Sequence, residues 1–240
     1  MLFRSRQSKD GSIQRYYPQP LDVIGGQMLA PENAEMISNA PFEGWKPLGT
    51  RETRTLEKVT DSPWLSDSAM TGYLTGKSFK PDQERDLFQY EDRIGLTVDA
   101  SRRTYKEGLF YRARFVRPQE GVGLLIHLNQ SVFASSGTIS IGAESRSGRY
   151  SVLDFKAPEP AKPSRQVKVV LTTPAYFDDG WRPQSLDWSP WLGSGARLVS
   201  MVLGKAQAIS GWDIVRREPK PLRHFIPAGS VFYFENAEWQ

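Results

Sequence analysis

The sequence has no cysteine among its 240 residues. Disulfides and thiolate metal sites are therefore excluded, and nothing in the composition indicates secretion. Histidine is nearly absent as well, because His127 and His224 are the only two, and no metal-ligand spacing is present. Long apolar runs are missing, since a stretch such as Val122–Leu128 has the size of a strand and a membrane helix needs roughly 20 residues. The first residues are polar and basic, without the apolar core of a signal peptide, which predicts a cytoplasmic protein.

Catalytic motifs are also scarce. There is no phosphate-binding Walker loop, nucleophile elbow or dinucleotide fingerprint. The adjacent Asp178 and Asp179 are candidates for a metal or acid–base pair, but "FDDGW" is typical of a turn, and neighbouring carboxylates point apart on a strand. His127 lies in a strand-like run and is interpreted as structural, whereas His224 lies among cations and either contacts phosphate or is solvated. The sequence therefore predicts no catalytic residue, no metal and no cofactor.

Charge is present in local blocks. The net charge is only +4, but the segment from Arg93 to Arg117 has seven cations and two acids, a net charge of +5. A second segment, Lys205 to His224, has five cations and two acids, a net charge of +3, so the rest of the chain is net acidic. Such blocks on a near-neutral body favour a localised site for a polyanion. The alternative is that the cations are solvated at strand ends.

The second part of the chain alternates apolar and polar residues with a period of two, and Gly and Pro separate the segments. This pattern predicts an all-β or strand-rich α+β fold and disfavours a doubly wound parallel sheet. It divides the chain into a Pro/Gly-rich N-terminal part with short helices, 1–92, and a strand-rich module, 93–240. The predicted strands are Ile94–Val98, Leu109–Val116, Val122–Leu128, Thr138–Ile141, Tyr150–Phe155, Val167–Thr172, Leu198–Leu203 and Ser230–Glu235.

Helices are predicted only before residue 93. The clearest one covers Asp67–Leu74, because Ser66 is a suitable N-cap and Gly76 a suitable C-terminal stop. Two weaker candidates are Pro81–Tyr90 and the segment that begins at Pro31.

Seven local patterns, in chain order, resemble one known family. They are YYPQPLDVI, WLSDSAMTGYLTG, YEDRIGLTVDASRRTYKEGLFY, TISIGAESR, VVLTTPAYFDDGWRP, ISGWD and PKPLRHFIPAGSVFYFE. Together they span nearly the whole chain and resemble the third subunit of the Cmr effector complex of type III-B CRISPR systems, a member of the RAMP superfamily. The resemblance implies an α+β fold of ferredoxin-like (RRM-like) units.

The same resemblance implies a function in antiviral defence. Such a subunit is a non-catalytic RNA-binding scaffold that helps to anchor the 5′ tag of CRISPR RNA. Its implied partners are the CRISPR RNA, the large polymerase-like subunit and the backbone RAMP subunit. The sequence departs from the family pattern in two places, because the usual N-terminal strand segment and the usual C-terminal glycine-rich loop are not found in these 240 residues. The fold is therefore expected to be incomplete at both ends.

The two basic blocks are then interpreted as phosphate contacts that converge in one groove. The expected RNA-binding residues are Arg93, Arg102, Arg103, Lys106, Arg146, Arg216, Arg217, Lys220 and Arg223. The expected structural residues are Gly142, Glu144, Gly211, Trp212 and Gly229. Trp212 is expected to be a buried packing residue, and stacking on a base is the alternative for its ring.

Two other functions stay open. One is a RAMP-type endoribonuclease that processes CRISPR RNA, with His127 or His224 and a tyrosine as the acid–base groups. The other, independent of the resemblance, is a β-sandwich that binds glycans through Trp181, Trp188 and Trp191.

Overall fold

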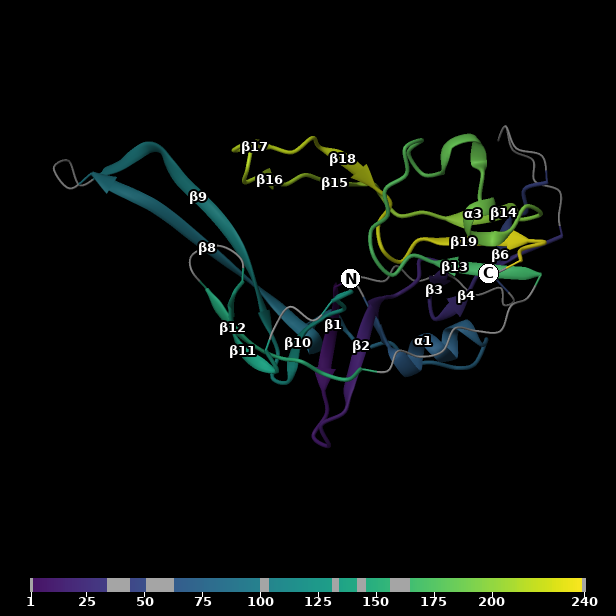
Figure 1. Ribbon diagram of the computed structural model, residues 1–240, viewed down its shortest axis with the longest axis horizontal. Coiled ribbons are helices and arrows are strands. Elements are labelled where there is room, and N and C mark those ends of the chain that lie inside the picture. The colour runs from purple at the N-terminus through teal and green to yellow at the C-terminus, as the bar shows by residue number, and fades with distance from the viewer. Residues whose placement is uncertain are drawn as a thin grey trace.

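The structure is a computed structural model that describes residues 2–33, 44–50, 63–99, 104–130, 134–141, 146–155 and 165–238. This part of the chain is rich in strands, and Figure 1 shows two sheets in the body and two hairpins that project from it. Its helices are all short: α1 (Asp67–Leu74), α2 (Glu84–Leu87), α3 (Ser189–Leu192) and a 3-10 turn (Gln184–Leu186). None of the described helices has the length and apolar character needed to cross a bilayer.

The first sheet has four antiparallel strands in the order β10-β1-β2-β7. Its members are β1 (Leu2–Gln7), β2 (Ile13–Pro18), β7 (Trp64–Ser66) and β10 (Val122–Ile126). In chain order the last strand lies beside the first, which is the strand order of a Greek key. The sheet therefore joins segments from both sides of residue 92, and residue 92 itself lies inside strand β8.

Helix α1 covers one part of this sheet and begins where the sequence predicts. The Ser66 hydroxyl accepts a hydrogen bond from the Ala69 amide (3.3 Å), and Gly76 follows the helix with φ +70°. The helix buries Met70 and Tyr73 against Phe3, Tyr17 and Leu65, which form the core between helix and sheet.

The second sheet has the order β13-β19-β14, with β13 (Gln166–Val170), β14 (Arg197–Val202) and β19 (Val231–Glu235). The central strand β19 is buried on both faces, which explains its unbroken apolar run. Phe232 and Phe234 face a cluster around Trp188, and Val231 and Tyr233 face the opposite side.

A buried polar cluster joins the two sheets. Asp22 is fully buried and accepts hydrogen bonds from the hydroxyl groups of Tyr73 on α1 (2.7 Å) and Tyr233 on β19 (2.5 Å). The ammonium group of Lys168 on β13 lies 3.6 Å from the same carboxylate and 3.7 Å from the centre of the Tyr73 ring. Burial, and then the neighbouring carboxylate, raise the pKa of both tyrosines, whereas burial lowers the pKa of Lys168.

The remaining strands form two-stranded ribbons. The longest is the β8–β9 hairpin (Phe88–Asp99 and Thr104–Pro118), which projects to the upper left in Figure 1. A second projection, the β15–β18 arm, pairs β15 (Gln207–Ile209) with β18 (Arg223–Phe225) and, further out, β16 (Trp212–Asp213) with β17 (Glu218–Pro219). The others pair β3 (Val23–Ile24) with β4 (Gln27–Met28), β5 (Ala30–Pro31) with β6 (Leu48–Gly49), and β11 (Ser136–Ser140) with β12 (Ser147–Ser151).

The strand-rich fold is confirmed, and seven of the eight expected strands agree over most of their length with β8 to β11, β13, β14 and β19. The strand expected at Tyr150–Phe155 is wrong beyond Ser151, because β12 covers Ser147–Ser151. The strands β1 to β7 and β15 to β18 were not among those expected. Helix Asp67–Leu74 is also confirmed. The helix expected over Pro81–Tyr90 is wrong beyond Leu87, because Phe88 begins β8 and pairs with Pro118. The helix expected after Pro31 lies mostly outside the described residues, although Pro31 itself is in β5.

The first sheet joins residues from both sides of the expected division at residue 92. Residues 1–92 were expected to be a Pro/Gly-rich part with short helices, and two strands of this part, β1 and β2, lie at the centre of the four-stranded sheet. The partner of β1 is β10, more than a hundred residues away, so local pattern alone does not reveal the pairing.

Candidate RNA-binding surface

The β8–β9 hairpin carries most of one basic block. In its antiparallel register Glu91 lies opposite Phe115 and Asp92 lies opposite Arg114. Side chains of successive residues point to opposite faces of a ribbon, so the two acids serve different faces. Each acid has two arginine neighbours on its own face.

The ion pairs of the hairpin follow this division. The Asp92 carboxylate pairs with Arg112 (2.7 Å) and Arg114 (3.0 Å), and hydrogen bonds from Arg114 and then Arg112 lower the pKa of Asp92 to about 2. On the other face Glu91 pairs with Arg93 (2.7 Å) and Arg117 (3.0 Å). Because each carboxylate serves two guanidinium groups, the cluster keeps a positive charge and unused N–H donors.

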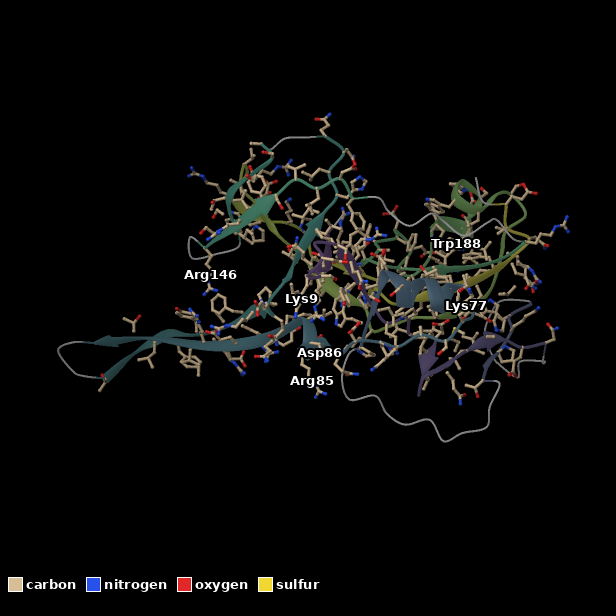
Figure 2. All side chains as sticks on the ribbon, turned by 90° about the horizontal axis from the view of Figure 1, so that it is seen from below. Lys9, Lys77, Arg85, Asp86, Arg146 and Trp188 are labelled. Atoms are coloured by element: carbon tan, nitrogen blue, oxygen red, sulfur yellow. The ribbon has the colours of Figure 1, made fainter. Side chains whose placement is uncertain are left out.

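A third hairpin adds another arginine to the Glu91 face. Arg146, just before β12, places its guanidinium carbon 3.9 Å from the centre of the Phe115 ring, and Arg93 lies 5.0 Å from the same ring. Figure 2 shows Arg146 in the space between the β8–β9 hairpin and the strands above it. Two of the residues expected to bind RNA, Arg93 and Arg146, are therefore brought together although they are more than fifty residues apart in the sequence.

The second basic block lies on the β15–β18 arm and is highly exposed. Arg216 lies 3.8 Å from Glu218, at the limit of an ion pair. Arg217 has φ +56° in the turn, and Lys220 follows β17. Nearer the body, the Arg223 guanidinium lies 4.7 Å from the centre of the Tyr176 ring, and this ring contacts Phe225.

The two basic blocks lie on separate projections of the structure. Both projections extend to the same side of the body in Figure 1. The expected convergence of residues 99–107 with the arm stays a prediction, because the hairpin tip at 100–103 lies outside the described residues. The same holds for Arg102 and Arg103, for Gly142 and Glu144, and for the side chain of Lys106.

Two of the expected structural residues need correction. Trp212 is 58% exposed, so its ring is not buried in this chain, because the arm stands away from the core. Gly211 has no positive φ, and an added Cβ would meet only the Lys220 side chain at 3.7 Å, an ordinary contact. Gly229 differs, since it has φ +88° and an added Cβ would lie 2.9 Å from the Gln19 carbonyl oxygen.

Sequence reasoning missed several members of the surface. Arg112, Arg114 and Arg117 were counted in the basic block but not chosen as site residues, and the Phe115 platform was not foreseen. The alternation in "YRARFVR" is the signal that places Arg112 and Arg114 on one face of the strand. Nothing local identifies Phe115 as the ring on which Arg146 stacks.

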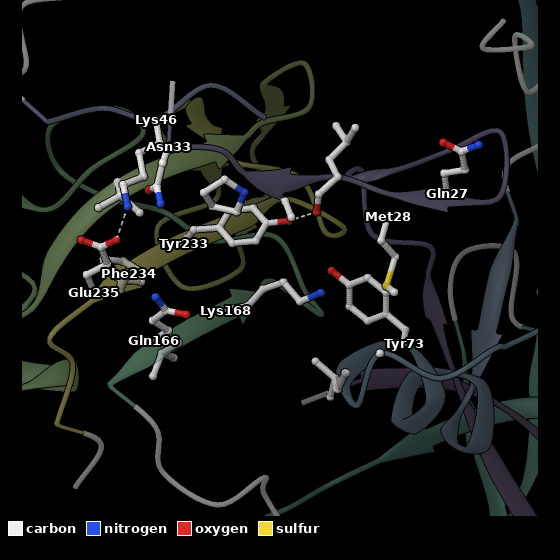
Figure 3. A pocket seen from close by; sticks show the side chains of 17 residues that line it. Gln27, Met28, Asn33, Lys46, Tyr73, Gln166, Lys168, Tyr233, Phe234 and Glu235 are labelled. Atoms are coloured by element: carbon white, nitrogen blue, oxygen red, sulfur yellow. Dashed lines mark hydrogen bonds and ion pairs between the residues drawn. The ribbon is translucent and has the colours of Figure 1, made fainter. Parts of the chain in front are cut away.

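A pocket of about 630 Å³ lies elsewhere, beside the buried polar cluster. Figure 3 shows Lys168 facing Tyr73 at one end of it and Lys46 paired with Glu235 at the other. Both lysines thus have carboxylate partners, Asp22 and Glu235. No group of His, Asp or Glu suited to hold a metal ion is found in the described part of the chain.

The fold and this surface define a strand-rich protein with two projecting basic hairpins. Its family is given by sequence comparison: the profile of the CRISPR-associated protein Cas_Cmr3 matches residues 2–239, and the chain belongs to this family. The resemblance to the third subunit of the type III-B Cmr complex is thereby confirmed.

One curated protein and one solved structure are similar to this chain. The CRISPR system CMR subunit Cmr3 of Saccharolobus solfataricus is 28% identical over 150 residues, which cover 60% of this chain and 44% of that protein. A chain in the cryo-EM structure of the type III-B Cmr-β complex bound to cognate target RNA has a similar fold. Its TM-score is 0.53 at 16% identity, over 97% of this chain and 64% of that one. This chain therefore spans less than two thirds of the length of either relative.

Proposed function

We propose that the chain is a non-catalytic, RNA-binding scaffold subunit of a type III-B CRISPR (Cmr) ribonucleoprotein in antiviral defence. In this proposal it acts in the cytoplasm and helps to anchor the 5′ tag of CRISPR RNA beside the large polymerase-like subunit and the backbone RAMP subunit. The observation that carries the proposal is the convergence of Arg93 and Arg146 on one ring beside the arginines of the β8–β9 hairpin.

The charges of this cluster suit a phosphate chain. Five arginines share two carboxylates, which leaves a net charge of +3; the arginines are Arg93, Arg112, Arg114, Arg117 and Arg146. A guanidinium group that stacks on a ring by its face keeps N–H donors at its edge, and this planar edge matches phosphate oxygens. Such contacts position RNA without reading its sequence.

The ferredoxin-like units implied by the family are part of the same proposal. A four-stranded antiparallel sheet with α1 packed on it supports them. Within this sheet the chain order is β1-β2-β7-α1-β10, which in the described residues departs from the β-α-β-β-α-β succession of that fold.

The proposed function includes no catalytic reaction. His224 is exposed on β18, and among the described residues no ion pair joins it to a carboxylate that could orient it as a general base. An endoribonuclease remains the second candidate, and cleavage of CRISPR repeat RNA that is lost on His224→Ala would support it. The glycan-binding hypothesis is dropped, because the family is established and Trp188 packs in the core against Phe232 and Phe234.

The experiment measures the salt dependence of RNA binding. Each cation that contacts a phosphate adds about 0.7 to the slope of log K against log salt on a single strand. Arg93→Gln with Arg146→Gln should lower the slope by about 1.4, and Lys220→Ala with Arg223→Ala, two cations of the arm, by about the same amount. The matched control replaces Lys9, Lys77 and Arg85, exposed cations outside both projections (Figure 2), and should leave the slope unchanged.

Two results would contradict the proposal. If neither variant changes the slope, the cations do not contact phosphate. If the Lys220 and Arg223 variant keeps its RNA affinity but no longer joins the complex, these two cations pair with acidic groups of a neighbouring subunit.

A further inference from the structure

The tip of the β15–β18 arm holds the most exposed aliphatic side chains of the described chain. Ile214 is 83% exposed and Val215 is 92% exposed, whereas no other large apolar side chain in the described residues exceeds 65%. Trp212, at 58%, lies directly before the tip. Single exposed apolar residues are ordinary on protein surfaces, but a group of them at the end of a projecting arm indicates an interaction site.

The tip has a defined conformation. One oxygen of the Asp213 carboxylate accepts hydrogen bonds from the amides of Val215 (2.9 Å) and Arg216 (3.0 Å), which is the pattern of an Asx turn. Behind the tip, the Lys220 amide donates to the Gly211 carbonyl group (2.8 Å). These hydrogen bonds hold the backbone of the turn, so the conformation of the turn exposes Ile214 and Val215 to the solvent.

The arm has no core of its own. From residue 205 to residue 224 every residue is exposed except Asp213, which is half-buried. A two-stranded ribbon is only marginally stable alone in water, because it buries little apolar surface. A partner that covers the tip would supply the missing apolar contacts.

We propose that Ile214 and Val215 dock, as an apolar knob, into an apolar pocket with an acidic rim on a neighbouring protein subunit. This proposal rests on the proposed function, in which the chain belongs to a multisubunit complex. The acidic rim follows from Arg216 and Arg217, which adjoin the knob. Among the described residues the one ion pair of these two guanidinium groups joins Arg216 to Glu218 at 3.8 Å. Complementary charge around an apolar centre is the common arrangement of protein interfaces.

The aliphatic side chains of the knob favour a protein as the binding partner over RNA. Unpaired bases stack on aromatic rings and on guanidinium planes, and branched aliphatic side chains have no such plane. The arm offers rings and cations for RNA nearer its base, at Tyr176 and Arg223. The tip and the base of the arm would therefore serve different partners.

The test replaces the knob in the full chain and measures two bindings. Ile214→Ser with Val215→Ser should weaken binding to the remaining subunits of the reconstituted complex about tenfold or more, as for a central interface residue. The RNA affinity of the chain, its salt slope and its melting temperature should stay as in the unchanged protein. Leu128→Ser with Val152→Ser, two aliphatic residues exposed away from the arm, is the matched control and should affect neither binding.

The sign of the rim is tested at one position. In an acidic-rimmed pocket Val215→Asp should weaken assembly more than Val215→Ser does, and Val215→Lys should weaken it less than Val215→Asp. The reverse order would overturn the acidic rim.

Three outcomes separate the proposals. Unchanged assembly in the serine variant overturns the docking knob and leaves the proposed function intact. Loss of RNA affinity with unchanged assembly would show that the tip inserts between RNA bases, and this result also overturns the docking of the knob into a protein. Loss of assembly with RNA binding retained supports the knob, whereas a failed RNA scaffold would show in the slopes of the arginine variants.

Discussion

Asp22→Ala tests whether the buried polar cluster holds the two sheets together. The carboxylate is the shared acceptor of Tyr73 on α1 and Tyr233 on β19, and it is the nearest carboxylate to Lys168 on β13. These residues come from the N-terminal and C-terminal parts of the chain, so the cluster is a direct polar link between them. We expect a large loss of stability and a cooperative unfolding transition at lower denaturant.

The magnitude follows from the groups left behind. The Tyr73 hydroxyl would lose its acceptor in the interior, and a buried unsatisfied group costs about 1–3 kcal/mol. Tyr233 would keep the Leu29 carbonyl oxygen at 2.9 Å. Lys168 would lose its counter-charge, but at 3.6 Å and with 21% of its side chain exposed this adds less than the ~3–5 kcal/mol of a fully buried pair. The expected total is about 4 kcal/mol, a large share of the ~5–15 kcal/mol of a typical domain.

Two further variants identify the source of this loss. Asp22→Asn keeps an oxygen acceptor and removes the charge, so it should cost less, about 2 kcal/mol. Combined with Lys168→Met, which removes the ammonium group and keeps the apolar stem, its cost should be less than additive by about 1 kcal/mol, because no unpaired ammonium remains. Asp10→Ala, at an exposed carboxylate that accepts hydrogen bonds from Ser12, is the control and should stay within about 0.5 kcal/mol.

The cluster also predicts how stability depends on alkaline pH. The pKa values of Tyr73 and Tyr233 are raised in the folded state, so their contribution is present below the ordinary pKa of 10.0 and is lost as the pH rises above it. The lowered pKa of Lys168 acts in the opposite direction up to 10.5 and reduces the net loss. In Asp22→Asn the alkaline loss should be shallower, because the neighbouring carboxylate no longer opposes ionisation of the phenols.

Urea unfolding, followed by circular dichroism and by tryptophan fluorescence, measures all of these variants. The reasoning is refuted if Asp22→Ala unfolds within 1 kcal/mol of the unchanged protein, a limit about equal to one ordinary hydrogen bond. It is also refuted if Asp22→Asn with Lys168→Met is strictly additive, because the carboxylate and the ammonium group would then be independent.

Three shorter predictions concern other parts of the fold. Gly229→Ala should destabilise the protein by about 2 kcal/mol, because it places a side chain at φ +88° and close to the Gln19 carbonyl oxygen. Gly211→Ala should be neutral within about 0.5 kcal/mol. Equal effects of the two variants in thermal unfolding would contradict the structural role given to Gly229. Trp212→Ala should cost below about 1 kcal/mol in the same assay, because its ring is 58% exposed, and a loss of 3 kcal/mol or more would show that it is buried. The lowered pKa of Asp92 stabilises the fold above the ordinary pKa of 3.8, and this contribution is lost as the pH falls to about 2; Asp92→Asn should therefore flatten the melting temperature against pH in this range.

Local pattern was sufficient for part of the secondary structure. The alternation of apolar and polar residues predicted strands at β8 to β14 and β19, whereas β1 to β7 and β15 to β18 were not predicted. Ser66 and Gly76 bounded α1 because their effects act within one turn of the helix. The family could also be identified from the sequence, because the patterns that identify it are stretches of consecutive residues.

The way these elements combine depends on contacts between distant parts of the chain. Strand pairing depends on side chains that meet across the fold, so nothing near β1 indicates that β10 is its partner. The contact of Arg146 with the Phe115 ring also cannot be predicted from neighbouring residues. Asp22 resembles an ordinary loop residue in the sequence, and only the folded chain places it between the hydroxyl groups of Tyr73 and Tyr233. Trp212 is the opposite case: an aromatic residue usually packs in the core, but the arm that carries it leaves the core and exposes its ring. Burial is a property of the assembled chain, which is why sequence located the elements and only their packing fixed which residues are buried.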